Sequence, residues 1–182
     1  MLIVISGPSG VGKGTICKRV SELTGIKIAV SVTSREQRKG EKEARDYYYI
    51  TDEEFRLRIE RGDFLEYAVV YGHYYGTLKT EVSEGDVILE IDTQGAMKVL
   101  KAQPEVLSIF LVPPSLEELK ERLMKRDREP IAAIEARLKA AEAEIAIGHK
   151  RYKYIVTNDD VDRASREVAK IIRETLDKGA EV

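Results

Sequence analysis

A glycine-rich segment near the start of the chain has the composition of a phosphate-binding loop. In the sequence LIVISGPSGVGKGT, residues 2–15, an apolar and β-branched run ends at Ser6, four glycines follow, and Lys13 stands between the last two. Glycines let backbone N–H groups turn toward phosphate oxygens, and the N-terminus of a following helix adds a favourable dipole. A strand–turn–helix whose glycines only make the turn is the alternative. The apolar strand, the glycine spacing and the placing of Lys13 favour a phosphate site.

One position of this loop departs from the usual pattern. In phosphate loops a Ser or Thr directly after the lysine binds Mg²⁺, whereas here Gly14 follows Lys13 and the hydroxyl comes at Thr15. Nucleoside monophosphate kinases commonly carry the sequence GKGT, and the chain resembles that group here. In those kinases the phosphates and water molecules supply most of the ligands of the metal ion. The resemblance implies that Thr15 contacts a phosphate near the start of the helix.

A second set of polar residues lies between residues 31 and 96. The segment SVTSREQRKGE carries two arginines three positions apart, and DYYYI, GDFLEY, GHYYGT and LEIDTQGA follow it. If the acceptor of a phosphoryl group is itself a phosphate, two negative groups must be brought together. Each pair of unit charges about 4 Å apart repels by about 4 kcal/mol in partly screened surroundings, so nearby arginines are needed to offset this repulsion. These segments, in this order, resemble the GMP-binding elements of guanylate kinases, and with the loop the resemblance covers essentially the whole chain.

The resemblance implies an enzyme that transfers a phosphoryl group from ATP to GMP, and also to dGMP. The implied GMP-binding residues are Ser31, Arg35, Arg38, Tyr47, Glu66, Tyr75, Thr77 and Asp92. The two arginines and two tyrosines would bind the GMP phosphate. A guanidinium group can donate two parallel hydrogen bonds to phosphate oxygens, and phenol hydroxyls can donate to the remaining oxygens. Glu66 would accept hydrogen bonds from guanine N1–H and the amino group, which adenine lacks at those positions. Asp92 would also lie near the metal and its waters.

On the donor side the resemblance implies ATP, held by the glycine loop, by two arginines of a lid and by an asparagine. These residues are Gly7, Pro8, Ser9, Gly10, Val11, Gly12, Lys13, Gly14, Thr15, Arg122, Arg126 and Asn158. The implied catalytic residues, which would neutralise charge on the moving phosphoryl group, are Lys13, Arg35, Arg126 and Arg137. Any single lid arginine could instead form a surface ion pair, for instance with Glu118 or Glu129. Mg²⁺ is the implied cofactor, held mainly through phosphates and water.

The chain also departs from the family pattern at several positions. Gln37 replaces a proline common between the two phosphate arginines, and Ala44 replaces a usual glycine before DYYYI. The lid reads RDREPIAA, where Pro130 is atypical. None of these changes removes a cation or the base-reading carboxylate. They bear on the shapes of the loops and on lid closure.

The elements that must position these residues are strands alternating with helices. Short apolar runs predict strands at 2–5, 28–32, 87–91, 107–112 and 154–157. Amphipathic stripes predict helices after the glycine loop, at residues 116–123 and 134–145, and at 164–176, the last capped from Asn158 or Asp159. This alternation indicates a three-layer α/β/α fold around a five-stranded parallel sheet.

Two segments interrupt this rhythm within one domain, residues 1–182. Residues 33–83, rich in Tyr, Arg and Glu, predict a small mixed α/β insertion with a helix near Asp52–Arg61, and the resemblance implies that it binds GMP. Residues 116–148 are charged and helical in pattern, and the resemblance implies that they form a lid. The core is then expected to comprise about residues 1–32, 84–115 and 149–182.

Composition narrows the class further. The 182 residues are 43% hydrophobic and 34% charged with a net charge of −2, typical of a globular protein and unlike a polyanion binder. No apolar run approaches the roughly 20 residues of a membrane span. One cysteine, Cys17, excludes an internal disulfide and indicates the cytoplasm. The expected partners are ATP and GMP, with no nucleic acid and no membrane, for a monomer or a homodimer.

Two other functions remain open on the sequence alone. A related small-molecule kinase, such as a ribose bisphosphate kinase, would keep the loop and the lid arginines but would not need Glu66 together with Thr77. A non-catalytic guanylate-kinase-like binding module would typically lack an intact loop and would be joined to further domains. Lys13 and the arginine set argue against that module.

Overall fold

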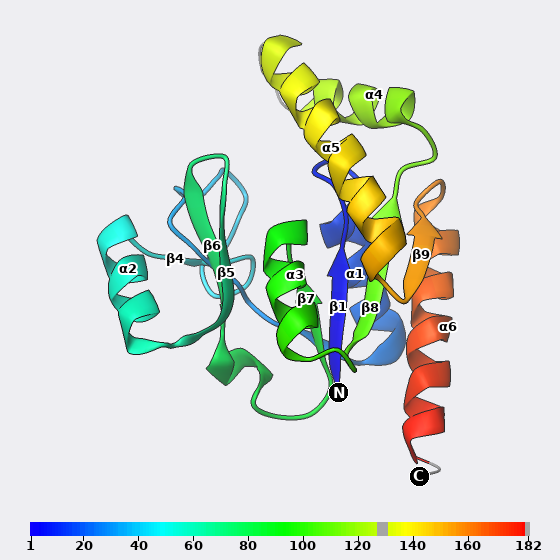
Figure 1. The fold of residues 1–182 in the computed structure, drawn as a ribbon, viewed down its shortest axis with the longest axis horizontal. Coiled ribbons are helices and arrows are strands. Elements are labelled where there is room, and N and C mark those ends of the chain that lie inside the picture. The colour runs from blue at the N-terminus through cyan, green and yellow to red at the C-terminus, as the bar shows by residue number, and fades with distance from the viewer. Residues whose placement is uncertain (127–130, 181–182) are drawn as a thin grey trace.

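The centre of the molecule is a five-stranded parallel sheet in the order β2-β7-β1-β8-β9 (Figure 1). The structure, a computed structural model, describes residues 1–126 and 131–180, with only the backbone of Arg126 and Ala180. The strands of this sheet are β1 (Leu2–Ser6), β2 (Lys27–Ile28), β7 (Val87–Glu90), β8 (Leu107–Val112) and β9 (Tyr154–Thr157). The predicted five-stranded parallel core is confirmed.

Helices cover both faces of this sheet, because successive side chains of each buried strand point to opposite sides. On one face Ile3 and Ile5 of β1 pack against α1 and α6, while on the other Val4 packs in a cluster with residues of α3 and α5. The covering helices are α1 (Lys13–Thr24), α3 (Thr93–Ala102), α5 (Ile131–Arg151) and α6 (Val161–Ala180). The result is the predicted α/β/α arrangement of three layers.

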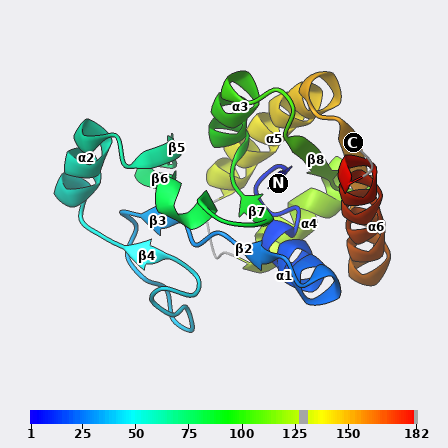
Figure 2. The same cartoon turned by 90° about the horizontal axis from the view of Figure 1, so that it is seen from below.

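The first insertion forms a second sheet to one side of the core (Figure 1 and Figure 2). Its order is β4-β3-β6-β5, with β3 parallel to β4 and antiparallel to β6. Its elements are β3 (Val32–Thr33), β4 (Tyr48–Tyr49), α2 (Asp52–Arg61), β5 (Phe64–Val70), β6 (His73–Leu78) and the 3-10 helix η1 (Lys79–Val82). Phe55 of α2 stacks on Phe64 of β5 with ring centres 4.3 Å apart, which gives this subdomain an aromatic core of its own.

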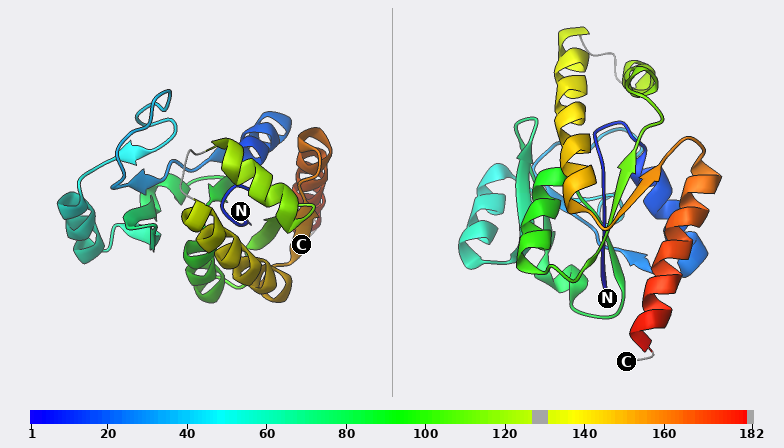
Figure 3. Two further views of the ribbon diagram at one scale, coloured as in Figure 1. Left: turned by 90° about the horizontal axis from the view of Figure 1, so that it is seen from above. Right: turned by 45° about the vertical axis from the view of Figure 1, so that its right-hand side comes forward.

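The second insertion is helical and projects beyond the carboxyl ends of the core strands (Figure 3). It consists of α4 (Leu116–Arg126) and the first part of α5, joined by a small cluster that includes Leu119, Leu123 and Ile134. The α5 helix then continues into the core, where the backbone of Gly148 lies against Phe110 of β8. A Cβ at residue 148 would lie 2.4 Å from the Phe110 ring, so only glycine permits this approach.

Two details of the predicted elements are wrong. The expected strand at 28–32 is two strands, because Ala29 N–H bonds to the core sheet while the carbonyl of Ser31 accepts from Tyr48 in the second sheet. The chain therefore crosses between sheets within that apolar run. The cap of α6 is Asp160, whose carboxylate accepts from the backbone of Arg163, because the Asp159 carboxylate is engaged by the backbone of Asp160 and the side chain of Arg163.

Ala44 adopts a left-handed backbone conformation. Its φ is +58°, and its N–H donates to the carbonyl of Tyr47 in a tight loop of the first insertion. An L-residue with a Cβ carries a steric cost in this region that glycine does not. The glycine that is usual before DYYYI therefore matches what this backbone requires, and alanine holds the same turn under strain.

Replacing Ala44 with glycine should stabilise the protein. We expect the free energy of unfolding to rise by about 0.5–1 kcal/mol, because relief of the left-handed strain exceeds the added chain entropy of glycine. Chemical unfolding followed by circular dichroism measures this change. The matched control is Ala140→Gly, at an exposed site within α5, which should lower stability by about 1 kcal/mol. A loss of stability in both variants would contradict the strain at residue 44.

Candidate active site

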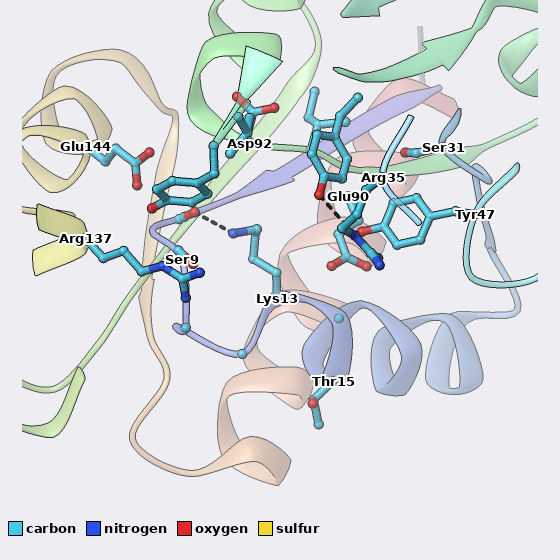
Figure 4. Close-up of a pocket in the computed structure, with 18 of the residues that line it drawn as sticks. Ser9, Lys13, Thr15, Ser31, Arg35, Tyr47, Glu90, Asp92, Arg137 and Glu144 are labelled. Atoms are coloured by element: carbon cyan, nitrogen blue, oxygen red, sulfur yellow. Dashed lines mark hydrogen bonds between the residues drawn. The ribbon is translucent and has the colours of Figure 1, made fainter. Parts of the chain in front are cut away.

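One cavity of about 760 Å³ lies at the carboxyl ends of the core strands, between the two insertions (Figure 4). The glycine loop follows β1, Asp92 lies just beyond β7, and Asn158 directly follows β9, so all three reach this edge of the sheet. Ligands of open parallel sheets bind outside this edge. Ser31 lines the cavity from the end of the preceding core segment, and the first insertion contributes Arg35, Arg38, Glu41, Tyr47, Glu66, Val70, Tyr71, Tyr75 and Gly76.

The glycine loop has the geometry of a phosphate cradle. Gly10 and Gly12 have φ of +84° and +96°, conformations that few other residues adopt, and Gly12 directly precedes α1. The Lys13 ammonium lies over the loop and donates to the carbonyl of Gly7 at 2.6 Å and of Pro8 at 3.3 Å. The N-terminus of α1 and a cation thus face the cavity together, an arrangement suited to anions.

Gly14, which stands where a hydroxyl is usual, lies beside a carboxylate. A Cβ at residue 14 would lie 3.3 Å from Oε1 of Glu90, a residue at the end of β7 that lines the cavity. A larger residue 14 would therefore require a small shift of the Glu90 side chain. Thr15, one residue later, is exposed and also lines the cavity.

On the side of the glycine loop, the cavity is bordered by contacts between the loop, the end of β9 and α4. The side-chain amide of the buried Asn158 donates to the carbonyl of Val11 at 2.7 Å. Arg122 donates to Asn158 O at 2.9 Å and to Glu118 at 2.5 Å, so one of the alternative ion pairs forms while Arg122 also lines the cavity. Pro8 and Val11 are not among the lining residues, and Val11 packs into the core.

The side of the cavity formed by the first insertion contains a buried carboxylate. Glu66 is 4% exposed, and the hydroxyl of Thr77 donates to its Oε1 at 2.9 Å. Burial raises the pKa of Glu66 to about 7, with Asp92 adding to the rise and the Thr77 hydrogen bond opposing it. The backbone of Gly95 makes room for this carboxylate, because a Cβ there would lie 2.2 Å from Oε2 of Glu66. The position of the Glu66 carboxylate therefore explains why the segment LEIDTQGA has a glycine at residue 95.

Cations and phenols gather next to Glu66. Arg35 is 9% exposed, and its Nε donates to the hydroxyl of Tyr75 at 3.2 Å, as the dashed line in Figure 4 marks. Tyr47 lies beside Arg35, whose guanidinium is 5.4 Å from the ring centre, and burial together with Glu90 raises the pKa of Tyr47 to about 12. Arg38 is exposed and Ser31 partly buried, and both line the cavity.

The second insertion reaches the same cavity through α5. The Arg137 guanidinium lies 4.9 Å from the ring centre of Tyr71, at the tip of the β5–β6 hairpin, so the two insertions touch here. The side chain of Arg126 lies outside the described residues, as does Pro130. Glu144 also lines the cavity, and burial raises its pKa while Lys13 lowers it.

Among the cavity residues that had no role in the sequence prediction, four carry ionisable side chains, namely Glu41, Tyr71, Glu90 and Glu144. Two of them carried a usable signal. Glu90 is a charged residue within the predicted apolar strand at 87–91, two positions before Asp92. Glu144 is seven positions from Arg137, which places both on one face of a helix. The other two depend on tertiary folding. Except for Pro8, Val11, Thr77 and the undescribed Arg126 side chain, the predicted site residues all line the cavity.

These features define the class of protein. A glycine loop joins a central parallel strand to a helix that points at the cavity, and two insertions close on it, which is the architecture of a P-loop α/β kinase.

Comparison with known proteins identifies the family. The guanylate kinase family model matches residues 1–175. Guanylate kinases from Caldanaerobacter subterraneus subsp. tengcongensis and Clostridium tetani are 49% and 48% identical, each over 94% of this chain and over 86% and 85% of their own lengths. The crystal structure of guanylate kinase from Anaplasma phagocytophilum matches with a TM-score of 0.80 and 34% identity, covering 96% of this chain and 85% of that one. The chain therefore belongs to the guanylate kinase family, as its motifs predicted.

Adding one methyl group at Gly95 should impair the acceptor half alone. In Gly95→Ala the new Cβ must displace the Glu66 carboxylate, so we expect the Kd for GMP to rise by at least tenfold while the Kd for ATP stays within twofold. Isothermal titration calorimetry measures both. Gly179→Ala is the matched control, since a Cβ there meets nothing within 4 Å. Equal losses for both nucleotides would contradict this local effect.

Proposed function

We propose that this chain transfers the γ-phosphoryl group of ATP to GMP, giving ADP and GDP, and that it also accepts dGMP. The observation that carries the proposal is a single cavity with two unlike halves. A glycine loop with Lys13 lies on one side, and a buried carboxylate beside an arginine–tyrosine cluster lies on the other. The names of the relatives support the same reaction. Nothing in the cavity favours ribose bisphosphate kinase or a non-catalytic module.

On the donor side the glycine loop would hold the ATP phosphates, and Asn158 with Arg122 would border the nucleotide. Lys13 would exchange the loop carbonyls that it now bonds for phosphate oxygens. Phosphoryl transfer needs positioning and positive charge more than a protein nucleophile. Arg137 and Arg126, on the lid, would therefore supply charge to the moving group rather than form a covalent intermediate.

On the acceptor side Glu66 would read the base. A carboxylate accepts but cannot donate, so it suits the two donors that guanine presents at N1 and the exocyclic amine. Thr77 and Ser31 would border the base, and Arg35, Arg38, Tyr47 and Tyr75 would hold the phosphate. An in-line attack by a phosphate oxygen of GMP on ATP completes the reaction.

Magnesium is the proposed cofactor. Glu90, Asp92 and Glu144 line the cavity, and carboxylate oxygens suit this hard cation or its waters. Within the described residues, no three His, Cys, Asp or Glu side chains form a group that could hold a metal. The donor set therefore fits an ion held mainly by phosphates and water, which would neutralise charge on the transferring group, with Asp92 contacting its waters.

The proposed division of labour follows the chain. Residues 1–32, 84–115 and 149–182 form the core, residues 33–83 the GMP-binding insertion, and residues 116–148 the lid. Closure of both insertions would exclude water and so limit ATP hydrolysis. Among the described residues, none of the helices has the length and apolar character that a membrane crossing requires. The cytoplasm is the proposed location.

A panel of acceptors tests this proposal. Coupled ADP production with GMP, dGMP, AMP, UMP and ribose bisphosphate should show turnover with the two guanylates only. In Glu66→Gln, kcat/KM for GMP should fall about a hundredfold, since two hydrogen bonds to a charged acceptor are weakened, while KM for ATP should be unchanged.

Two controls define the outcome of this assay. Glu60→Gln changes an exposed carboxylate of α2 and should leave every rate unchanged. Lys13→Ala should abolish turnover with all acceptors without unfolding the chain. Equal kinetics of the wild type and Glu66→Gln with GMP would refute the base-reading role, and turnover with ribose bisphosphate alone would replace the proposed function.

The raised pKa of Glu66 predicts a pH dependence. Only the ionised carboxylate accepts both hydrogen bonds, so kcat/KM for GMP should fall about tenfold as pH drops from 8 to 6, around the pKa of about 7. In Glu66→Gln this limb should disappear, leaving only the second ionisation of the GMP phosphate near pH ~6. Initial rates at saturating ATP measure both profiles. An identical limb in the two enzymes would assign it to the phosphate instead.

A further inference from the structure

Glu41 is the acceptor of an unusually dense set of hydrogen bonds in the cavity. Its Oε1 accepts from Nη2 of Arg35 at 2.9 Å, and its Oε2 accepts from Nη1 of Arg35 at 3.1 Å. Oε2 also accepts from the backbone N–H of Arg38 at 2.8 Å and from the hydroxyl of Tyr49 at 2.7 Å. Partial burial acts to raise the pKa of Glu41, but these bonds lower it to about 2, so the group is a carboxylate at working pH.

The contacts of Arg35 show which of its edges Glu41 occupies. A guanidinium has a planar fork of five N–H donors, two at the end, formed by Nη1 and Nη2, and two along the side, formed by Nε and Nη2. Glu41 takes the end, and the carbonyl of Glu36 takes the outer Nη1–H at 2.6 Å. The side edge faces the Tyr75 hydroxyl, which lines the cavity. The side edge of the Arg35 guanidinium therefore faces the cavity, and Glu41 binds the opposite end, formed by Nη1 and Nη2.

The surroundings of Arg35 and Glu41 restrict both groups further. The rings of Tyr47 and Tyr49 lie 5.4 and 5.9 Å from the Arg35 guanidinium, within the range of cation–π contact. The side chain of Gln37 donates to the carbonyl of Glu41 at 2.6 Å and so closes the loop between the two arginines. Gln37, which stands where a proline is common, thus ties this loop by a hydrogen bond.

We propose that Glu41 is a positioning residue for the phosphate of the acceptor nucleotide. By holding the end of Arg35 and the backbone of Arg38, it fixes the orientation in which both arginines meet that phosphate. The proposal rests on the proposed function, since it assumes that Arg35 binds the GMP phosphate. Preorganised charged groups bind more tightly than groups that must be ordered on binding.

The negative charge of Glu41 gives a second account, which predicts the opposite change in GMP affinity when that charge is removed. A carboxylate beside Arg35 cancels one of the two positive charges of the cluster, so Coulomb attraction alone predicts that its removal tightens phosphate binding. The same follows if Glu41 merely occupies the phosphate position and must leave when GMP binds. Positioning predicts weaker binding, and the sign of the change therefore separates the two accounts.

Calorimetric titration of Glu41→Gln with GMP, guanosine and ATP tests the proposal. Gln keeps the size of the side chain but loses the charge and one acceptor oxygen. We expect the Kd for GMP to rise tenfold or more, while the Kd values for guanosine, which has no phosphate, and for ATP change by less than twofold. Glu43→Gln is the matched control, because Glu43 lies in the same loop but accepts from the backbone of Tyr49 rather than from Arg35. It should leave all three values unchanged.

A double-mutant cycle shows whether Glu41 acts through Arg35. In the Arg35→Ala background, the change Glu41→Gln should alter GMP binding by less than twofold, since the group it positions is gone. Glu41→Asp, which keeps the charge on a shorter side chain, should bind GMP with intermediate affinity. It also provides the test if Glu41→Gln does not fold by circular dichroism.

The outcomes separate this inference from the proposed function. If the wild type binds no GMP, the proposed function fails. If the wild type binds GMP while Glu41→Gln binds it equally well or more tightly, the positioning role fails and the function stands. Parallel losses for GMP, guanosine and ATP would show a general structural role and would also overturn the inference.

Discussion

The parallel pairing of β1 with β7 and β8 is the interaction on which the site depends. It places the carboxyl ends of these strands at one edge of the sheet, and the glycine loop, Glu90 and Asp92 emerge from that edge. The pairing is buried on both faces by apolar side chains, so its register is fixed by packing. Polar groups can then stand at defined distances from one another although they belong to segments far apart in the chain. The first insertion and the lid add their residues to this fixed edge.

The surroundings of each carboxylate in the cavity decide its protonation state. Glu66 and Glu41 are both cavity carboxylates of the first insertion, yet burial raises the pKa of Glu66 to about 7 while three donors hold that of Glu41 at about 2. The charge of Glu66 therefore depends on pH near neutrality, whereas Glu41 stays ionised and bonded to Arg35 and Arg38. Glycines make these arrangements feasible, since Gly95 gives space to Glu66 and Gly14 gives space to Glu90.

Much of the fold and of the site could be predicted from the sequence, because local patterns and motifs carried them. The apolar runs of β1, β8 and β9 and the helix Asp52–Arg61 appear where expected, since their period and length are unambiguous. The 28–32 run was misleading, because hydrophobicity does not say which of two sheets a residue joins. Glu41 and Tyr71 could not be predicted, since a lone carboxylate or a tyrosine at a hairpin tip reads as surface. Only the meeting of distant segments gives them partners.

The α5 helix joins the second insertion to the core without interruption. Its last turns are seated on the sheet through the contact of Gly148 with Phe110, and its first turns carry Arg137 toward the cavity. A helix of 21 residues is about 30 Å long, so a tilt of roughly 10° at its seat would displace its far end by about 5 Å. Such a helix can act as a rigid lever with its fulcrum in the hydrophobic interior. A small change in the packing of Gly148 against Phe110 would thus be enlarged in the turns that carry Arg137.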